Sequence, residues 1–111
     1  MYKAIKIDVD NQTISQVEIN GLEDLQKIVE GRIEVVHYFE NGDVCYGNEE
    51  GLFCFGDQPK GWFHIQGSLP TNPIKGNGVI VGTTEDGDSE DPKTTLEQVK
   101  SITEFKDLIL V

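Results

Sequence analysis

The feature that most constrains this fold is the dipeptide Asn41-Gly42, which ends the run RIEVVHYFE at residues 32–40. β-branched and aromatic residues favour a strand, and Asn-Gly is typical of a two-residue type I′ turn, in which both residues have positive φ. The chain is therefore expected to reverse here and to return through residues 43–48 as an antiparallel strand. A two-residue loop also fixes the register, with His37 opposite Tyr46.

Further short runs of β-prone residues, each ended by turn residues, extend this hairpin into a meandering, mostly antiparallel sheet of about six strands. The additional strands are expected at residues 3–9, 13–19, 52–55, 62–66 and 78–83. The last of these, GVIVGT, is apolar over most of its length, which is typical of a buried strand.

Two helices are expected beside the sheet. A short one lies near residues 22–30, and a C-terminal one lies near residues 95–108, where Thr94 and Glu97 form a capping box. Their apolar faces consist of Leu22, Leu25, Ile28 and Val29 in the first helix, and of Leu96, Val99, Ile102 and Phe105 in the second. Because no linker or internal repeat divides the chain, residues 1–111 are expected to form a single α+β domain.

The charge balance argues against several function classes. Twenty acidic residues against nine basic ones give a net charge of −11. Phosphate contact needs clustered Lys and Arg, so we expect neither direct nucleic-acid binding nor binding to anionic membranes. No apolar run approaches the roughly 20 residues that cross a bilayer. The N-terminus lacks the apolar region of a signal peptide, and the thiols of Cys45 and Cys54 are expected to be reduced, which favours a cytoplasmic protein.

Residues 85–91 read EDGDSED and are the densest group of charges in the chain. Their five carboxylates belong to Glu85, Asp86, Asp88, Glu90 and Asp91. Carboxylates crowded in this way repel one another and favour a basic protein surface, so these five are candidate partner-binding residues. The alternative is a hydrated connector whose acids stabilise the positive end of the following helix.

A calcium site is a third interpretation of the same stretch. Asp86, Asp88, Glu90 and Glu97 have the spacing of positions 1, 3, 5 and 12 in an EF-hand loop. Two features oppose this interpretation, because Asp91 stands where that loop needs glycine and because the preceding residues are β-prone. We therefore expect no bound metal and no other cofactor.

No catalytic constellation is apparent. The chain has no G-x-S-x-G sequence and no P-loop, so we do not expect an enzyme. In the predicted hairpin register His37 and Cys45 point to opposite faces of the sheet, which argues against zinc. A pocket for a small ligand such as a signalling nucleotide would need aromatic and cationic side chains. The candidates for such a pocket are Arg32, Tyr46, Lys60 and Trp62.

Four segments, in order, carry a resemblance to a known family: KAIKID, GLEDLQKIVEGRIEVV, NEEG and NPIKGNGVIVG. Together they resemble the small bacterial and phage proteins grouped as domain of unknown function 3846, from about Lys3 to Gly82. The resemblance implies a cytoplasmic protein carried by phages, plasmids or their hosts, and it implies no activity and no site residues. The stretch LFCFGDQPKGWFHIQGSLPT and the acidic residues 85–91 depart from the expected pattern.

The function that these observations favour is that of a non-enzymatic accessory or binding protein of a phage or mobile element. It would act through contact with a protein, for which a basic partner is favoured, and would modulate host machinery or defence. The alternatives are a protein that sequesters a small ligand and an acidic inhibitor of a DNA-binding protein. An exposed edge strand in so small a sheet also allows a homodimer.

Overall fold

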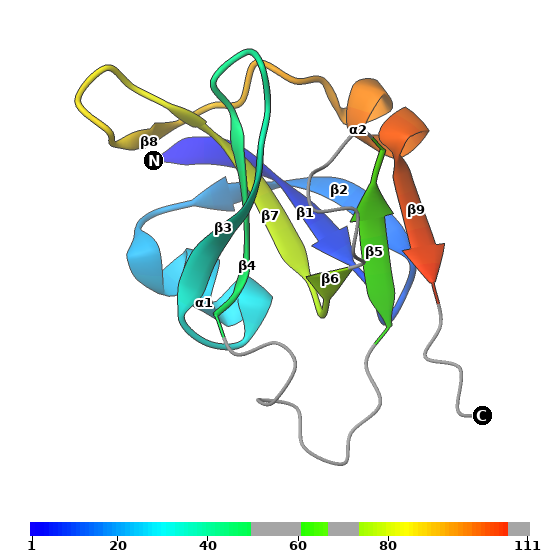
Figure 1. The fold of residues 1–111 in the computed structure, drawn as a ribbon. Coiled ribbons are helices and arrows are strands. Elements are labelled where there is room, and N and C mark those ends of the chain that lie inside the picture. Colours follow the sequence, from blue (N-terminus) through cyan, green and yellow to red (C-terminus); the bar gives the residue numbers. More distant parts are fainter. Residues whose placement is uncertain (50–60, 67–73, 107–111) are drawn as a thin grey trace.

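The computed structural model describes residues 1–49, 61–66 and 74–106 (Figure 1). Within them two antiparallel sheets and two helices form the α+β fold expected from the sequence. The larger sheet has the strand order β2 (Thr13–Ile19), β1 (Tyr2–Asp8), β7 (Gly78–Thr83), β4 (Val44–Asn48) and β3 (Ile33–Tyr38), and β8 (Ser89–Glu90) pairs with the end of β7. The smaller sheet has the order β6 (Ile74–Lys75), β5 (Trp62–Ile65) and β9 (Thr103–Lys106). The helices are α1 (Leu22–Val29) and α2 (Leu96–Ile102). The strand predicted at residues 52–55 lies outside the described residues.

β7 is the central strand of the fold and is covered on both faces. It pairs with β1 on one side and with β4 on the other. Val79 and Val81 belong to a buried cluster with Leu25 of α1, whereas Ile80 belongs to a cluster with Phe63 of β5. Figure 1 shows α1 to the left of β7, and the smaller sheet with α2 to its right. A strand covered on both faces has little room for polar side chains, which explains the apolar sequence GVIVGT.

The close packing of β5 on β7 depends on a glycine. A Cβ atom built on Gly78 would lie 2.5 Å from Cζ of Phe63 and 3.3 Å from Sγ of Cys45. Phe63 is fully buried, so its ring lies directly against the backbone of β7. This contact joins the two sheets.

The β3–β4 hairpin forms at Asn41-Gly42, but with a loop of a different type. The Phe39 N–H donates to the Asp43 carbonyl at 2.9 Å, the Gly42 N–H donates to the Phe39 carbonyl at 3.1 Å, and Gly42 has φ of 95°. These bonds define a three-residue loop closed by a glycine bulge, not the expected two-residue turn. The predicted register was therefore wrong.

In the observed register His37 lies opposite Cys45, and a bulge separates Val35 from His37. Directly opposed residues lie on one face of a sheet, so the prediction that His37 and Cys45 point to opposite faces was wrong.

The β7–β8 hairpin repeats the same loop. The Thr84 N–H donates to the Asp88 carbonyl at 2.8 Å, the Gly87 N–H donates to the Thr84 carbonyl at 3.0 Å, and Gly87 has φ of 90°. The two loops share a sequence pattern, ENGD at residues 40–43 and EDGD at residues 85–88. Glycine at the third position supplies the left-handed conformation that closes both loops.

The C-terminal helix is shorter than predicted. α2 ends at Ile102, and the chain continues as β9, in which Phe105 pairs with Phe63 of β5. The capping box is formed by Thr95 and Gln98, one residue later than the predicted pair, because Thr94 is bound by Asp43.

Candidate functional site

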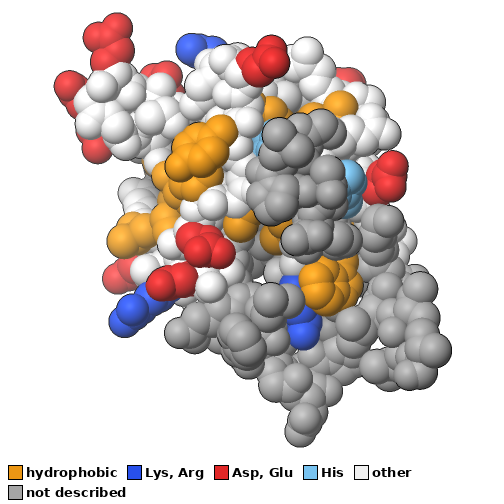
Figure 2. Space-filling view, viewed as in Figure 1, with side chains coloured by type: hydrophobic (Ala, Val, Ile, Leu, Met, Phe, Trp, Pro, Cys, Tyr) orange, Lys and Arg blue, Asp and Glu red, His pale blue; other side chains and the backbone are white. Residues whose placement is uncertain are grey.

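The β7–β8 hairpin, residues 83–90, projects from the sheet at the upper left of Figure 1. We call it the acidic hairpin, because Glu85, Asp86 and Asp88 lie on its loop and Glu90 on β8. All four side chains are exposed, and none has a hydrogen bond or ion pair with a described residue. Figure 2 shows acidic side chains gathered at this corner of the molecule. No Lys or Arg occurs between residues 76 and 92, so the hairpin carries its negative charge without a neighbouring base in the sequence.

Several contacts hold the acidic hairpin in a defined shape. Strand pairing joins Gly82 to Glu90 and Thr83 to Ser89, and the Thr84 hydroxyl accepts the Asp88 N–H at 3.0 Å. The fifth predicted partner-binding residue, Asp91, is exposed as well and also makes a contact within the fold. Its carboxylate accepts the Lys3 N–H at 2.7 Å and so attaches the end of the hairpin to β1.

A buried carboxylate anchors the segment that follows the hairpin. Asp43 is only 1% exposed and accepts hydrogen bonds from the Lys93 N–H at 3.0 Å, the Thr94 N–H at 2.7 Å and the Thr94 hydroxyl at 2.7 Å. The Asn41 side-chain amide donates to the same Thr94 hydroxyl at 2.9 Å. We call these contacts the Asp43 clasp. It joins the β3–β4 loop to the start of α2, and it was not foreseen from the sequence.

The clasp had one sequence signal, the recurrence of the E-x-G-D pattern. The fourth residue of the pattern is buried and bonded in the first loop, as Asp43, and exposed in the second, as Asp88. The local sequence thus determines the loop type, while contacts with distant residues determine whether the carboxylate is buried and hydrogen-bonded.

Two buried asparagines fix the C-terminal end of α1. The Asn48 side-chain amide donates to the carbonyls of Val29 and Glu30, at 3.0 and 3.1 Å. The Asn77 side-chain amide donates to the Ile28 carbonyl at 3.2 Å, and its oxygen accepts the Val9 N–H. These bonds satisfy carbonyls that the end of a helix leaves without partners, so both residues are structural.

The four predicted calcium residues do not form a metal centre in the structure. Asp86 and Asp88 lie on the hairpin loop, Glu90 lies on β8 and Glu97 lies on α2. Among the described residues, no group of three His, Cys, Asp or Glu side chains is placed to hold a metal ion. An EF-hand needs a helix before its loop, whereas the strand β7 precedes this one.

The described members of the predicted ligand-binding set do not belong to one cluster. Tyr46 packs against the apolar cluster beneath α1, whereas Trp62 belongs to the smaller sheet and has the Lys75 ammonium 6.0 Å from its ring centre. Arg32 is exposed before β3, and Lys60 lies outside the described residues.

The environment of Cys45 makes its thiol unreactive. The side chain is fully buried, and burial raises the pKa of the thiol to about 12, although a backbone hydrogen bond from Val79 opposes this shift. A thiol with so high a pKa carries almost no thiolate at neutral pH. His37, its neighbour across the hairpin, packs edge-on against Phe39 with the ring centres 4.5 Å apart, and burial lowers the pKa of this histidine. The predicted thiol Cys54 lies outside the described residues.

Within the described part of the chain, no helix has the length and apolar character needed to span a membrane.

Comparison with known proteins identifies a family but no activity. Neither curated proteins nor solved structures give a match. A family model described as a domain of unknown function, DUF3846, matches residues 2–106. The match therefore extends through the acidic hairpin and β9, beyond the limit at Gly82 that the sequence segments suggested. Because it covers nearly the whole chain, the protein belongs to the DUF3846 family.

Proposed function

We propose that this protein is a non-enzymatic accessory protein that acts by binding a basic protein through its acidic hairpin. We further propose that it works in the cytoplasm and belongs to a phage or mobile element, where its partner is part of the host machinery or of a defence system. The observation that carries the proposal is the display of Glu85, Asp86, Asp88 and Glu90 on a formed, projecting hairpin.

The four carboxylates of the acidic hairpin have no ion pair with a described residue. No base occurs in residues 76–92 either, so a partner that supplies positive charge would relieve their mutual repulsion. Lys and Arg side chains of a partner would supply that charge and would accelerate association through long-range attraction. A surface that binds nucleic acid is one source of such clustered bases, so a DNA-binding protein is one class of partner within the proposal.

The hairpin's attachment to the rest of the molecule supports a binding role over that of a connector. Asp91 bonds to β1, and the Asp43 clasp holds Lys93 and Thr94, so both ends of the acidic stretch are attached to the rest of the fold. A fixed arrangement reduces the entropy that the hairpin would lose on binding.

Affinity capture from cells of the source organism tests the proposal with three forms of the protein. The hairpin variant carries Glu85→Gln, Asp86→Asn, Asp88→Asn and Glu90→Gln. A control variant carries four substitutions at exposed acids elsewhere, so that both variants have the same net charge. Its substitutions are Glu18→Gln, Glu23→Gln, Glu34→Gln and Glu49→Gln.

We expect the wild type and the control variant to retain the same protein, and the hairpin variant to lose it. Bound protein should dissociate as salt is raised from roughly 0.05 to 0.5 M, because screening weakens contacts between exposed charges. Equal retention by the hairpin and control variants would contradict the proposed contact surface.

A further inference from the structure

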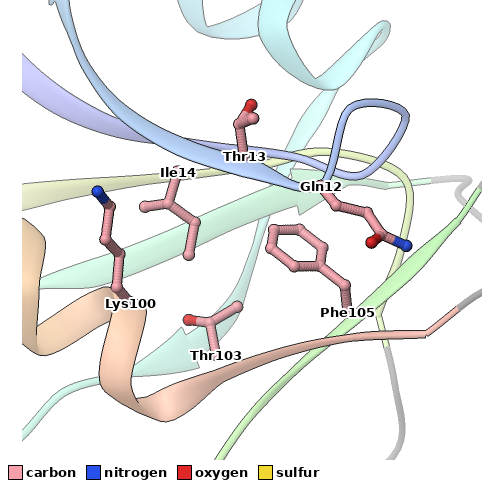
Figure 3. A pocket seen from close by; sticks show the side chains of 6 residues that line it. All are labelled: Gln12, Thr13, Ile14, Lys100, Thr103 and Phe105. Carbon is pink, nitrogen blue, oxygen red and sulfur yellow. The ribbon is translucent and has the colours of Figure 1, made fainter.

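A hollow lies between the edges of the two sheets. β2 is the edge strand of the larger sheet and β9 is the edge strand of the smaller one, and neither has a further partner among the described strands. The hollow has a volume of about 390 Å³ (Figure 3). It is lined by Gln12, Thr13, Ile14, Lys100, Thr103 and Phe105. Small-molecule sites typically have volumes of roughly 300–1,000 Å³.

The base of the hollow is apolar. Ile14 from β2 and Phe105 from β9 are half-buried and pack against the apolar cluster that contains Phe63. Figure 3 shows both side chains directed into the space between the strands. Together they offer a surface on which a flat apolar group can pack.

One wall of the hollow carries two side chains that can donate hydrogen bonds, Thr103 and Lys100. The Thr103 hydroxyl oxygen is buried and has no hydrogen-bond partner among the described residues. Figure 3 shows this hydroxyl on the side that faces Lys100. A buried hydroxyl without a partner costs free energy, so this hydroxyl would gain from a ligand oxygen that accepts its hydrogen bond.

Lys100 makes the hollow suitable for an anion. This side chain forms no ion pair with a described residue, and none of the described residues that line the hollow is acidic. In a chain with 20 acidic and 9 basic residues, a hollow whose described lining holds a base and no acid differs in charge from most of the molecule. Its positive charge selects for ligands that carry a negative group.

We infer that the hollow between β2 and β9 binds a small organic anion with a flat apolar body. The anionic group accepts hydrogen bonds from the Lys100 ammonium and the Thr103 hydroxyl, and the apolar body packs on Phe105 and Ile14. The site is independent of the acidic hairpin, and it places a small-ligand function at residues other than Arg32, Tyr46, Lys60 and Trp62.

NMR titration of the ¹⁵N-labelled protein tests the site, with 2-naphthoate as the anionic probe and 2-naphthylmethanol as its neutral counterpart. We expect saturable shifts of backbone amides at residues 12–14 and 100–105 with the anionic probe. Lys100→Gln should weaken its binding by about fivefold or more, because a charge-assisted hydrogen bond is lost. The matched control Lys27→Gln, at an exposed position on α1, should leave binding unchanged.

Thr103→Val supplies a second, independent readout. It removes the unpaired hydroxyl at nearly constant volume, so it should raise the melting temperature while weakening binding of 2-naphthoate. A hydroxyl with a purely structural role would give the opposite change in melting temperature.

Three results would overturn the inference: no saturable shift, shifts centred on α1 or the acidic hairpin, or equal affinities of the Lys100→Gln and Lys27→Gln variants for 2-naphthoate. Equal affinity of the wild type for the neutral and anionic probes would overturn the assignment of an anion.

Discussion

Replacing Asp43 with alanine removes the acceptor at the centre of the Asp43 clasp. Three donors lose their partner, namely the Lys93 N–H, the Thr94 N–H and the Thr94 hydroxyl, at a position where the Asp43 side chain is almost fully buried. Hydrogen bonds to a charged group contribute roughly 1.5–3 kcal/mol each, and an unpaired buried donor adds a desolvation cost. These terms are not additive, and removing the buried charge offsets part of them. We therefore expect the free energy of unfolding to fall by about 3–5 kcal/mol.

Asp88→Ala is the matched control for this prediction. Asp88 occupies the same position of the same loop type, but its side chain is exposed and has no hydrogen bond or ion pair with a described residue. Its replacement should change the free energy of unfolding by no more than about 0.5 kcal/mol, as is usual at surface positions.

Urea unfolding, followed by Trp62 fluorescence and far-ultraviolet circular dichroism, measures both effects. With an m-value of roughly 1.5 kcal/mol/M for a domain of this size, Asp43→Ala should lower the urea midpoint by about 2 M or more. Because domains of this size are stable by only about 5–15 kcal/mol, the milder Asp43→Asn variant is measured in parallel. Its amide keeps one acceptor oxygen, so its loss should be intermediate. Equal midpoints for Asp43→Ala and Asp88→Ala would refute the clasp as a major source of stability.

Three further predictions concern the core and its titrating groups. Gly78→Ala should cost about 1–3 kcal/mol in urea unfolding, because the new methyl group would lie 2.5 Å from Cζ of Phe63; an unchanged midpoint would contradict this packing. Burial lowers the pKa of His37 in the folded state from its ordinary value of 6.5, so the unfolded chain binds the proton more readily. The contribution of His37 to the free energy of unfolding is thus complete above pH 6.5 and declines as the pH falls toward the folded-state pKa. The urea midpoints at pH 7.5 and pH 5.5 should therefore differ less in His37→Gln than in the wild type. In a Cys54→Ser background, Cys45 should react with a thiol reagent at pH 8 much more slowly in the folded than in the unfolded protein, because its pKa is about 12; similar rates would contradict its burial.

Elements that depend on local pattern could be predicted from the sequence. The strand expected at residues 3–9 corresponds to β1, and the run GVIVGT matches β7, because period-two alternation and continuous apolar residues reflect the burial of each face. The helix expected near residues 22–30 corresponds to α1, because its apolar positions follow the helical period. Membership of the family was also evident from the sequence segments.

Elements that depend on distant parts of the chain could not be predicted in this way. The spacing of Val99, Ile102 and Phe105 continues the helical period, yet Phe105 pairs with Phe63 in the smaller sheet and so ends α2. The buried state of Asp43 depends on Thr94, 51 residues later in the sequence.

The candidate site residues also differ in whether they depend on local or on distant parts of the chain. The carboxylates of the acidic hairpin are visible in the sequence because they are consecutive or nearly so. The hollow between β2 and β9 is not visible, because its lining comes from residues 12–14 and 100–105, which only the fold brings together.

Native mass spectrometry of the protein, purified at low salt from cells of its source organism, tests the proposed protein contact most directly. We expect an additional mass of protein size on the wild type, absent from the hairpin variant and removed from the wild type by high salt. The same additional mass on the hairpin variant would contradict a contact through the acidic hairpin. A wild-type chain that carries no second protein would contradict the proposal of a protein partner.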